Sequence, residues 1–189
     1  TYAKNYEAEI SSRGEKLPHY TEVGVGFSKM CLTPMLEYGR QALEDNKKGV
    51  ATEALEQVAL AIVVTTAIVS IFLTRDFTPD YNSGLAHACF YALTAYPVIE
   101  KEHLHGEVVG FGVLYALLVD GQQEEFEKIY ALNKELGLPV RIADICITEE
   151  QFFETMDRIP QMSDIRHYPY AVTKEMLMKA YETIEQLPV

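Results

Sequence analysis

The sequence predicts an all-α fold, a helical bundle domain covering residues 1–189. Nearly every apolar segment repeats at the spacing of one helix face, and no stretch has convincing strand alternation. Glycine and proline separate most of these segments, as is typical of helix ends. With 48% apolar residues the chain can bury a sizeable core, and it contains no repeat or linker that would divide it. We therefore expect one domain.

The N-terminal third begins with two helical segments. We expect the first over residues 2–12, where Tyr2, Tyr6 and Ile10 recur at helical spacing. A break at residues 14–18 precedes a longer helix over about 23–45. Pro34 predicts a kink or boundary inside that helix, and Gly49 ends it.

The next segment, residues 58–73, is apolar on all sides apart from three hydroxyl residues. Such a pattern is typical of a central buried helix. A membrane span needs roughly 18 to 20 apolar residues, which exceeds this run, and charged residues lie close to both of its ends. We therefore expect a core helix, with no membrane association.

The second half is expected to start with a loop over residues 75–83, in which Asn82 or Ser83 could cap the following helix. Pro97 interrupts that helix, and a charged turn comes after it. Gly137 with Pro139 stops a later helix, and the sequence 148–151 forms a capping box. We expect helices over residues 84–95, 106–119, 122–136, 149–157 and 173–187. Residues 140–147 form the only apolar run that could be extended.

Charge and cysteine content exclude some classes of partner. The chain has 16 basic and 28 acidic residues, a net charge of −12, which disfavours nucleic acid and acidic lipid. The three cysteines, Cys31, Cys89 and Cys146, are odd in number and never form a Cys-x-x-Cys pair. We expect reduced thiols and a cytoplasmic protein.

Two histidines, His87 and His105, are the strongest functional signal. Both are flanked by glycine or small residues, and neutral imidazole is the commonest metal ligand of proteins. About eight helical residues descend roughly 12 Å beyond His87, and a similar number can climb back, so the two rings can meet. The pair predicts a metal site.

The other histidines are weaker candidates. His103 competes with His105, but His105 directly precedes Gly106 and the helix start, and we favour it. His19 and His167 lie in loops rich in tyrosine and proline and are expected to be structural.

Four further residues near the pair have structural interpretations. Cys89 points to a different helix face from His87 and is expected to pack in the core. Glu107 suits the helix dipole, and a role in orienting a metal ligand is equally open. Gly110 and Gly112 lack the pattern of a phosphate loop, so we expect them to permit close helix packing.

Two segments, 84–88 (Gly-Leu-Ala-His-Ala) and 105–112 (His-Gly-Glu-Val-Val-Gly-Phe-Gly), place their histidines 18 positions apart. They resemble the metal-binding region of the glycerol dehydrogenase branch of the iron- or zinc-containing polyol dehydrogenases. Residues 136–139 and 169–173 resemble the family's late helix break and the entry to its final helix. The resemblance covers essentially the whole chain, as the helical C-terminal half of such an enzyme.

The resemblance implies a ligand set and a mechanism. His87 and His105 would be the catalytic metal ligands. Residues 1–7 resemble the segment after the family's third ligand, an aspartate, which would directly precede Thr1. The metal, zinc rather than iron because Phe90 replaces a second histidine, would polarise a polyol hydroxyl for hydride transfer to NAD. The family's N-terminal α/β domain, which binds NAD, would be absent from this chain, so no residue here is assigned to that cofactor.

The resemblance also leaves the substrate open, since Tyr91 replaces a smaller polar residue of relatives. The family commonly forms homo-oligomers, which we expect here. The alternative is a non-catalytic assembly or interaction domain that retains the family fold.

Overall fold

The computed structural model describes residues 1–74 and 81–188. Its helices, with 3-10 and π turns labelled η, are α1 (Ala3–Ser12), α2 (His19–Lys48), α3 (Glu53–Leu60), η1 (Ala61–Thr65), α4 (Thr66–Leu73), α5 (Leu85–Leu93), α6 (Pro97–Glu102), α7 (His105–Val119), α8 (Gln123–Leu136), η2 (Ile142–Ile145), α9 (Glu149–Arg158), η3 (Ile159–Gln161), η4 (Ser163–Ile165) and α10 (Lys174–Glu185). The described residues contain no strand, which confirms the predicted all-α fold.

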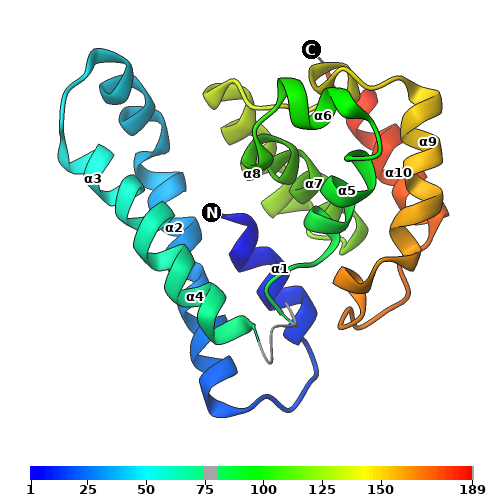
Figure 1. Cartoon of the computed structure of the whole chain (residues 1–189), viewed down its shortest axis with the longest axis horizontal. Coiled ribbons are helices and arrows are strands. Elements are labelled where there is room, and N and C mark those ends of the chain that lie inside the picture. The colour runs from blue at the N-terminus through cyan, green and yellow to red at the C-terminus, as the bar shows by residue number, and fades with distance from the viewer. Residues whose placement is uncertain (75–80, 189) are drawn as a thin grey trace.

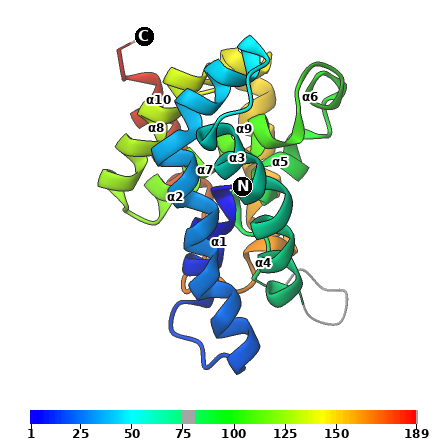
Figure 2. The same ribbon diagram turned by 90° about the vertical axis from the view of Figure 1, so that its left-hand side faces the viewer.

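The helices form two groups with α1 between them (Figure 1). On one side, α2 and the continuous helix α3–η1–α4 make a long hairpin, whose two arms run side by side in Figure 2 as well. On the other side, α5, α8 and α10 pack around α7. Every residue of α7 from Val108 to Leu117 is buried, so the core is centred on this helix.

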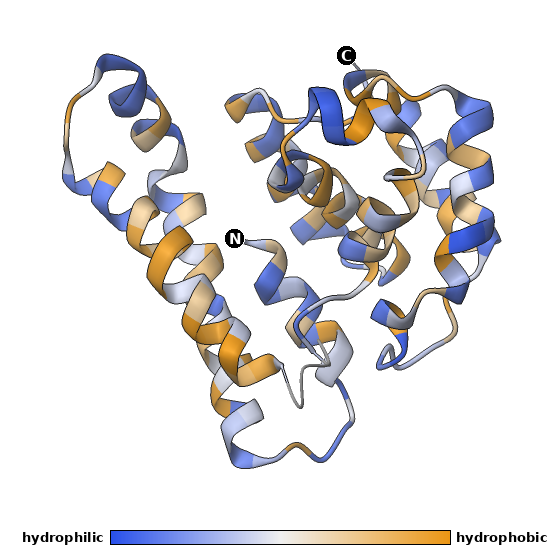
Figure 3. Ribbon diagram, viewed as in Figure 1, coloured by the Kyte–Doolittle hydropathy of each residue, from blue (hydrophilic) through white to orange (hydrophobic). Residues whose placement is uncertain are grey.

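The predicted central burial of residues 58–73 is wrong. They belong to a helix that runs from Glu53 to Leu73, and only 11% of its most apolar window is buried. One side packs on α2, whereas Val63 and Ile71 on the other side are 69% and 73% exposed. Figure 3 shows the apolar residues of this helix in orange along the hairpin. An all-apolar helix is buried only if other elements of the chain pack against each of its faces. Here α7 is the central buried helix instead.

The same helix is longer than the sequence predicted. With 21 residues it is the one helix of the described chain that is long and apolar enough to cross a membrane, by length and composition only. Its length therefore does not exclude a span, contrary to the sequence-based expectation. The absence of membrane association stays a prediction, supported by the packing of this helix on α2.

Local start and stop signals were more accurate. Gly49 and Gly137 end α2 and α8 with φ values of 68° and 70°, which favour glycine. The Thr148 hydroxyl accepts a hydrogen bond from the Gln151 amide, as the capping box predicted. Helix α2 runs through Pro34 without ending.

Three other local expectations need correction or fall outside the description. Pro97 begins the short helix α6 where a charged turn was expected, because proline suits the first helical position. Residues 142–145 of the possible extended run form a 3-10 turn. Most of the expected loop, residues 75–80, lies outside the described residues.

Candidate metal centre

His87 lies in the first turn of α5, where its side chain is held from behind by α1. It is 8% exposed. Its Nδ1 lies 2.6 Å from Oε2 of Glu7, a fully buried carboxylate on α1. A carboxylate only accepts hydrogen bonds, so Nδ1 donates to it. The nitrogen left available on the ring is Nε2.

Glu7 also caps α5. Its Oε1 accepts hydrogen bonds from the backbone amides of Gly84 and His87, both at 2.9 Å. The predicted cap by Asn82 or Ser83 is wrong, because the helix begins after Gly84 and has no local side-chain cap. The amides at the start of α5 donate hydrogen bonds to side chains that are distant in sequence, and not to the preceding loop.

The surroundings of Glu7 favour its charged form. Burial alone would raise the pKa of this carboxyl, but the charge and hydrogen bonds of His87, with Lys4, outweigh burial and lower the pKa. Tyr168 lies beside it and accepts a hydrogen bond from the Leu85 amide at 3.0 Å. The His87 ring is thus held by a buried cluster of hydrogen-bonded polar groups.

His105 is the first residue of α7, and its ring faces that of His87. The two ring centroids are 5.4 Å apart, and the planes are inclined by 47°. Phe90 packs edge-on against His105 with centroids 4.4 Å apart. Burial is the main cause that lowers the pKa of His105, and the nearby charges of His87 and Lys4 lower it further. Its imidazole is therefore neutral near pH 7, the form that binds metal.

The spacing of the two rings fits a shared metal ion. Imidazoles that each bind one tetrahedral ion through a nitrogen at about 2.0–2.1 Å have centroids roughly 5 Å apart. The observed separation of 5.4 Å agrees with that geometry. Within residues 1–74 and 81–188, no group of three or more His, Cys, Asp or Glu side chains could hold a metal. The described residues thus bring two candidate ligands, His87 and His105, together.

The competing residues near the pair have other partners. His103 Nδ1 lies 3.6 Å from Glu107 Oε2, and that same oxygen accepts a hydrogen bond from the Leu104 amide at 3.0 Å. Glu107 is therefore a helix-start carboxylate, one of its two expected roles. Cys89 is 1% exposed and belongs to the core, as predicted.

Gly112 allows two helices to touch, as predicted, because a Cβ there would lie 2.6 Å from the backbone carbonyl oxygen of Ala86 on α5. Gly110 instead makes room for a side chain at the N-terminal end of α1, since a Cβ there would lie 2.4 Å from the Tyr2 hydroxyl oxygen.

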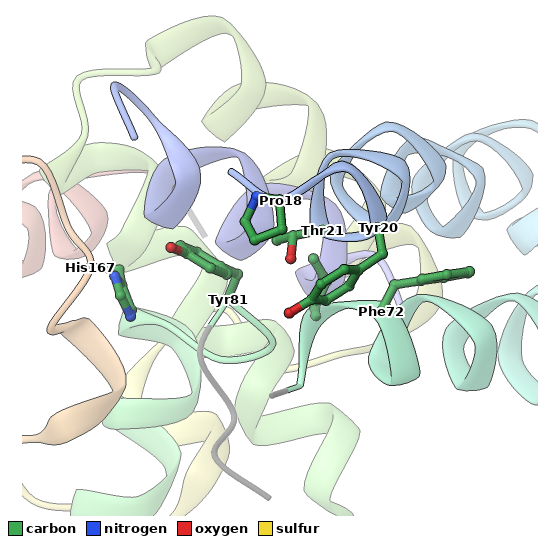
Figure 4. A pocket seen from close by; sticks show the side chains of 7 residues that line it. Pro18, Tyr20, Thr21, Phe72, Tyr81 and His167 are labelled. Atoms are coloured by element: carbon green, nitrogen blue, oxygen red, sulfur yellow. The ribbon is translucent and has the colours of Figure 1, made fainter. Parts of the chain in front are cut away.

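His19 and His167 lie apart from the pair. His19 is largely exposed and 3.9 Å from Glu22, and His167 Nδ1 is 2.8 Å from Glu15 Oε1. His167 borders a cavity of about 150 Å³ near the start of α2 (Figure 4). The cavity is lined by Pro18, Tyr20, Thr21, Phe72, Leu73, Tyr81 and His167. His167 is thus paired with the Glu15 carboxylate, away from His87 and His105.

Glu7 is the functional candidate that residue-level reasoning missed. It lies 80 positions before His87 in the sequence, and its helix shows no acidic pattern that marks it. A charged residue among Tyr6, Ala8 and Ile10 on the buried side of α1 is the signal that could have found it, because a buried carboxylate needs partners.

Comparisons with known proteins agree with this fold. No protein-family model matches the chain. A glycerol dehydrogenase of Escherichia coli O6:H1 is 31% identical over 134 residues, which are 69% of this chain and 33% of the relative. A glycerol dehydrogenase of Pseudomonas putida is 29% identical over 177 residues, 88% of this chain and 45% of the relative.

The solved structure of a probable glycerol dehydrogenase from Sinorhizobium meliloti 1021 has the same fold, with a TM-score of 0.78 at 20% identity. The match covers 97% of this chain and 51% of that one. The chain spans about half the length of that structure and less than half of the two curated relatives. Over this shared part, the chain belongs to the glycerol dehydrogenase family.

Proposed function

We propose that this chain is the metal-binding part of an NAD-dependent glycerol or polyol dehydrogenase, with His87 and His105 as ligands of one divalent ion. The observation that carries the proposal is the 5.4 Å separation of their ring centroids. Two imidazoles are nitrogen donors that suit zinc, and iron is the second candidate. The proposal extends to this chain the activity that the relatives' names describe.

The chain's own residues would bind and orient. His105, neutral near pH 7, and His87, held by Glu7, would present one nitrogen each to the ion. A bound divalent ion would lower the pKa of a substrate hydroxyl, so that hydride could pass to the nicotinamide of NAD. Phe90, packed against His105, would keep one side of this ring away from water. NAD itself would bind outside the residues of this chain.

Zinc titration by calorimetry tests the ligand assignment. With two histidine ligands, the chain should bind zinc with micromolar or weaker affinity, and His87→Ala and His105→Ala should each abolish measurable binding. His103→Ala is the matched control, because its side chain is also largely buried nearby but contacts Glu107. Equal loss in the control, or retention of zinc by both His→Ala variants, would contradict the assignment.

A third ligand is proposed from the family resemblance: an aspartate directly before Thr1. The test extends the chain at its N-terminus by one aspartate and, as a control of equal size, by one asparagine. The aspartate version should bind zinc more tightly than the asparagine version, because a carboxylate completes three protein ligands. Equal affinities would place the third ligand elsewhere.

The exposed apolar face of the hairpin favours a second candidate, a helical assembly domain without catalysis. That face includes Leu60, Val63, Ile68 and Ile71. Patches of this kind mark interaction surfaces in soluble proteins. A chain that self-associates but binds no zinc would support this alternative.

Other properties are proposed with the main function. We infer a small polyol substrate, a cytoplasmic location and contacts between copies of the chain. The charge of −12 disfavours nucleic acid. Cys31, Cys89 and Cys146 are free thiols, which fits a reducing compartment.

A further inference from the structure

Glu7 is a carboxylate of α1 that lies inside the core, where a charged group needs hydrogen-bond partners. Its side chain is 0% exposed, and both of its carboxylate oxygens accept hydrogen bonds from α5 or from the residue before it. A buried carboxylate without such partners would strongly destabilise the fold. Glu7 avoids that cost through three hydrogen bonds, all donated by the first turn of α5 and the residue before it.

The two oxygens of Glu7 divide these partners. Oε1 takes the backbone amides of Gly84 and His87, both at 2.9 Å, and Oε2 takes only the His87 ring at 2.6 Å. The amides fix the carboxylate in place because they belong to the helix backbone. The carboxylate in turn fixes which ring nitrogen of His87 carries the proton.

We propose that Glu7 is a positioning residue, which holds His87 as the Nδ1–H tautomer and leaves Nε2 free to bind the metal beside His105. This inference rests on the proposed metal-binding function. Metal-bound histidines commonly donate their other N–H to a carboxylate, and removal of that partner typically lowers metal affinity 10–100-fold. Here the same carboxylate also caps the ligand's helix, so ring orientation and helix start depend on one side chain.

Gly84 has a role in this arrangement. A Cβ at this position would lie 3.2 Å from Cγ of Glu7 and 3.1 Å from the ring and hydroxyl of Tyr168. These contacts are tighter than ordinary ones, so a larger residue would press on the carboxylate from one side. Gly84 therefore leaves room for Glu7 to reach both the backbone amides and the ring.

Glu7→Gln gives a sharp test because its amide cannot satisfy all the same donors. The glutamine oxygen is required by the amides of Gly84 and His87, which leaves its NH₂ group facing Nδ1 of His87. Nδ1 would then have to accept, so the ring proton would move to Nε2 and block the metal-binding nitrogen. The side chain keeps its size, so the packing of α1 is preserved.

Glu15→Gln is the matched control. Glu15 also pairs with a histidine, with its Oε1 2.8 Å from Nδ1 of His167, but at the surface and away from the site. Long-range ¹H–¹⁵N spectra at pH 8 would report which ring nitrogen of each histidine carries the proton. The His87→Ala variant identifies the His87 signal, and calorimetry measures zinc affinity.

We expect His87 in the unmodified chain to show the Nδ1–H tautomer. Glu7→Gln should shift it to Nε2–H and weaken zinc binding 10–100-fold, whereas Glu15→Gln should change neither. An unchanged tautomer, or zinc binding by Glu7→Gln as tight as in the unmodified chain, would overturn the positioning role and leave the proposed function standing.

The two proposals fail in different ways. Because the tautomer is read without metal, a chain that shows the expected tautomers but binds no zinc contradicts the proposed function alone. If Glu7→Gln does not fold, the spectrum of the unmodified chain still decides, since an Nε2–H tautomer there would overturn the inference.

Discussion

Gly112 of α7 and Ala86 of α5 touch through their backbones. A Cβ on Gly112 would lie 2.6 Å from the carbonyl oxygen and 2.9 Å from the Cα of Ala86. The next residue of α5 is His87, and α7 begins with His105. The close approach of the two helices therefore sets the distance between the two proposed metal ligands.

Gly112→Ala should destabilise the chain and weaken the zinc site. The added methyl group must push the α5 backbone away, and overpacking of this kind typically costs about 1–3 kcal/mol. Because the same displacement moves His87 from His105, zinc affinity should also fall. Urea denaturation measures the free energy of unfolding, and calorimetry measures zinc binding.

Gly26→Ala is the control for this substitution. Gly26 lies inside α2, and a Cβ there would meet no atom within 4 Å. Alanine is favoured over glycine in a helix by roughly 0.5–1 kcal/mol, so this variant should be slightly more stable. If Gly112→Ala matched the stability of the unmodified chain, the backbone contact would not set the helix spacing.

Helix ends were largely predictable because their signals are local. A residue with positive φ is needed where Gly49 and Gly137 end their helices, and glycine adopts it without strain. The capping box at Thr148 likewise uses side chains within four residues. The neighbourhood of His87 and His105 was predictable for a similar reason, since the short connection between α5 and α7 limits their separation.

Features that depend on distant partners were not predictable from sequence. The cap of α5 is Glu7, 77 positions before Gly84. The apolar neighbours of Glu7 indicate that its carboxylate is buried, but no local pattern indicates which helix it caps. The exposure of Val63 and Ile71 could not be inferred either, because an apolar run shows what would favour burial but not what covers it.

Asp120 should make stability depend on acid pH. It accepts two hydrogen bonds from the Arg13 guanidinium, at 2.7 and 2.9 Å, and one from the Tyr170 hydroxyl at 2.7 Å. Burial alone would raise the pKa of Asp120, but Arg13 and Tyr170, with Gln122, outweigh burial and lower it. Its contribution is thus present above the unfolded pKa of about 3.9 and is lost as pH falls through the lower folded pKa.

Asp120→Asn removes this contribution. The variant should be less stable at pH 7 by about 1.5–3 kcal/mol, the range for hydrogen bonds to charged groups. It should also lose less stability than the unmodified chain between pH 5 and the acid limit of folding. Asp157→Asn, which removes an exposed carboxylate paired with Lys174 at 2.6 Å, is the control. Parallel pH profiles for Asp120→Asn and the unmodified chain would contradict the assignment.

Tyr2 should contribute through its hydroxyl group. The hydroxyl donates a hydrogen bond of 2.9 Å to Oδ1 of Asn133, which is fully buried on α8. Tyr2→Phe would leave that oxygen without its donor, at a cost of about 1–3 kcal/mol. The exposed Tyr20 gives the control Tyr20→Phe, which should change unfolding by less than roughly 0.5 kcal/mol. Equal thermal unfolding of both variants would show that the buried hydrogen bond is not stabilising.

The exposed face of the hairpin should govern self-association. Val63 and Ile71 are 69% and 73% exposed, so the double variant Val63→Glu, Ile71→Glu adds charge where few intramolecular contacts are lost. Unfolding should change by no more than roughly 0.5 kcal/mol per site. If this face joins copies of the chain, the variant should elute as a smaller species than the unmodified chain, because facing carboxylates repel and resist burial.

Leu104→Glu, equally exposed at 73% but at the start of α7, should leave the size unchanged. Light scattering coupled to size exclusion gives the masses. An unmodified chain that stays monomeric at high concentration, or a double variant of unchanged mass, would rule out this face as the contact between copies.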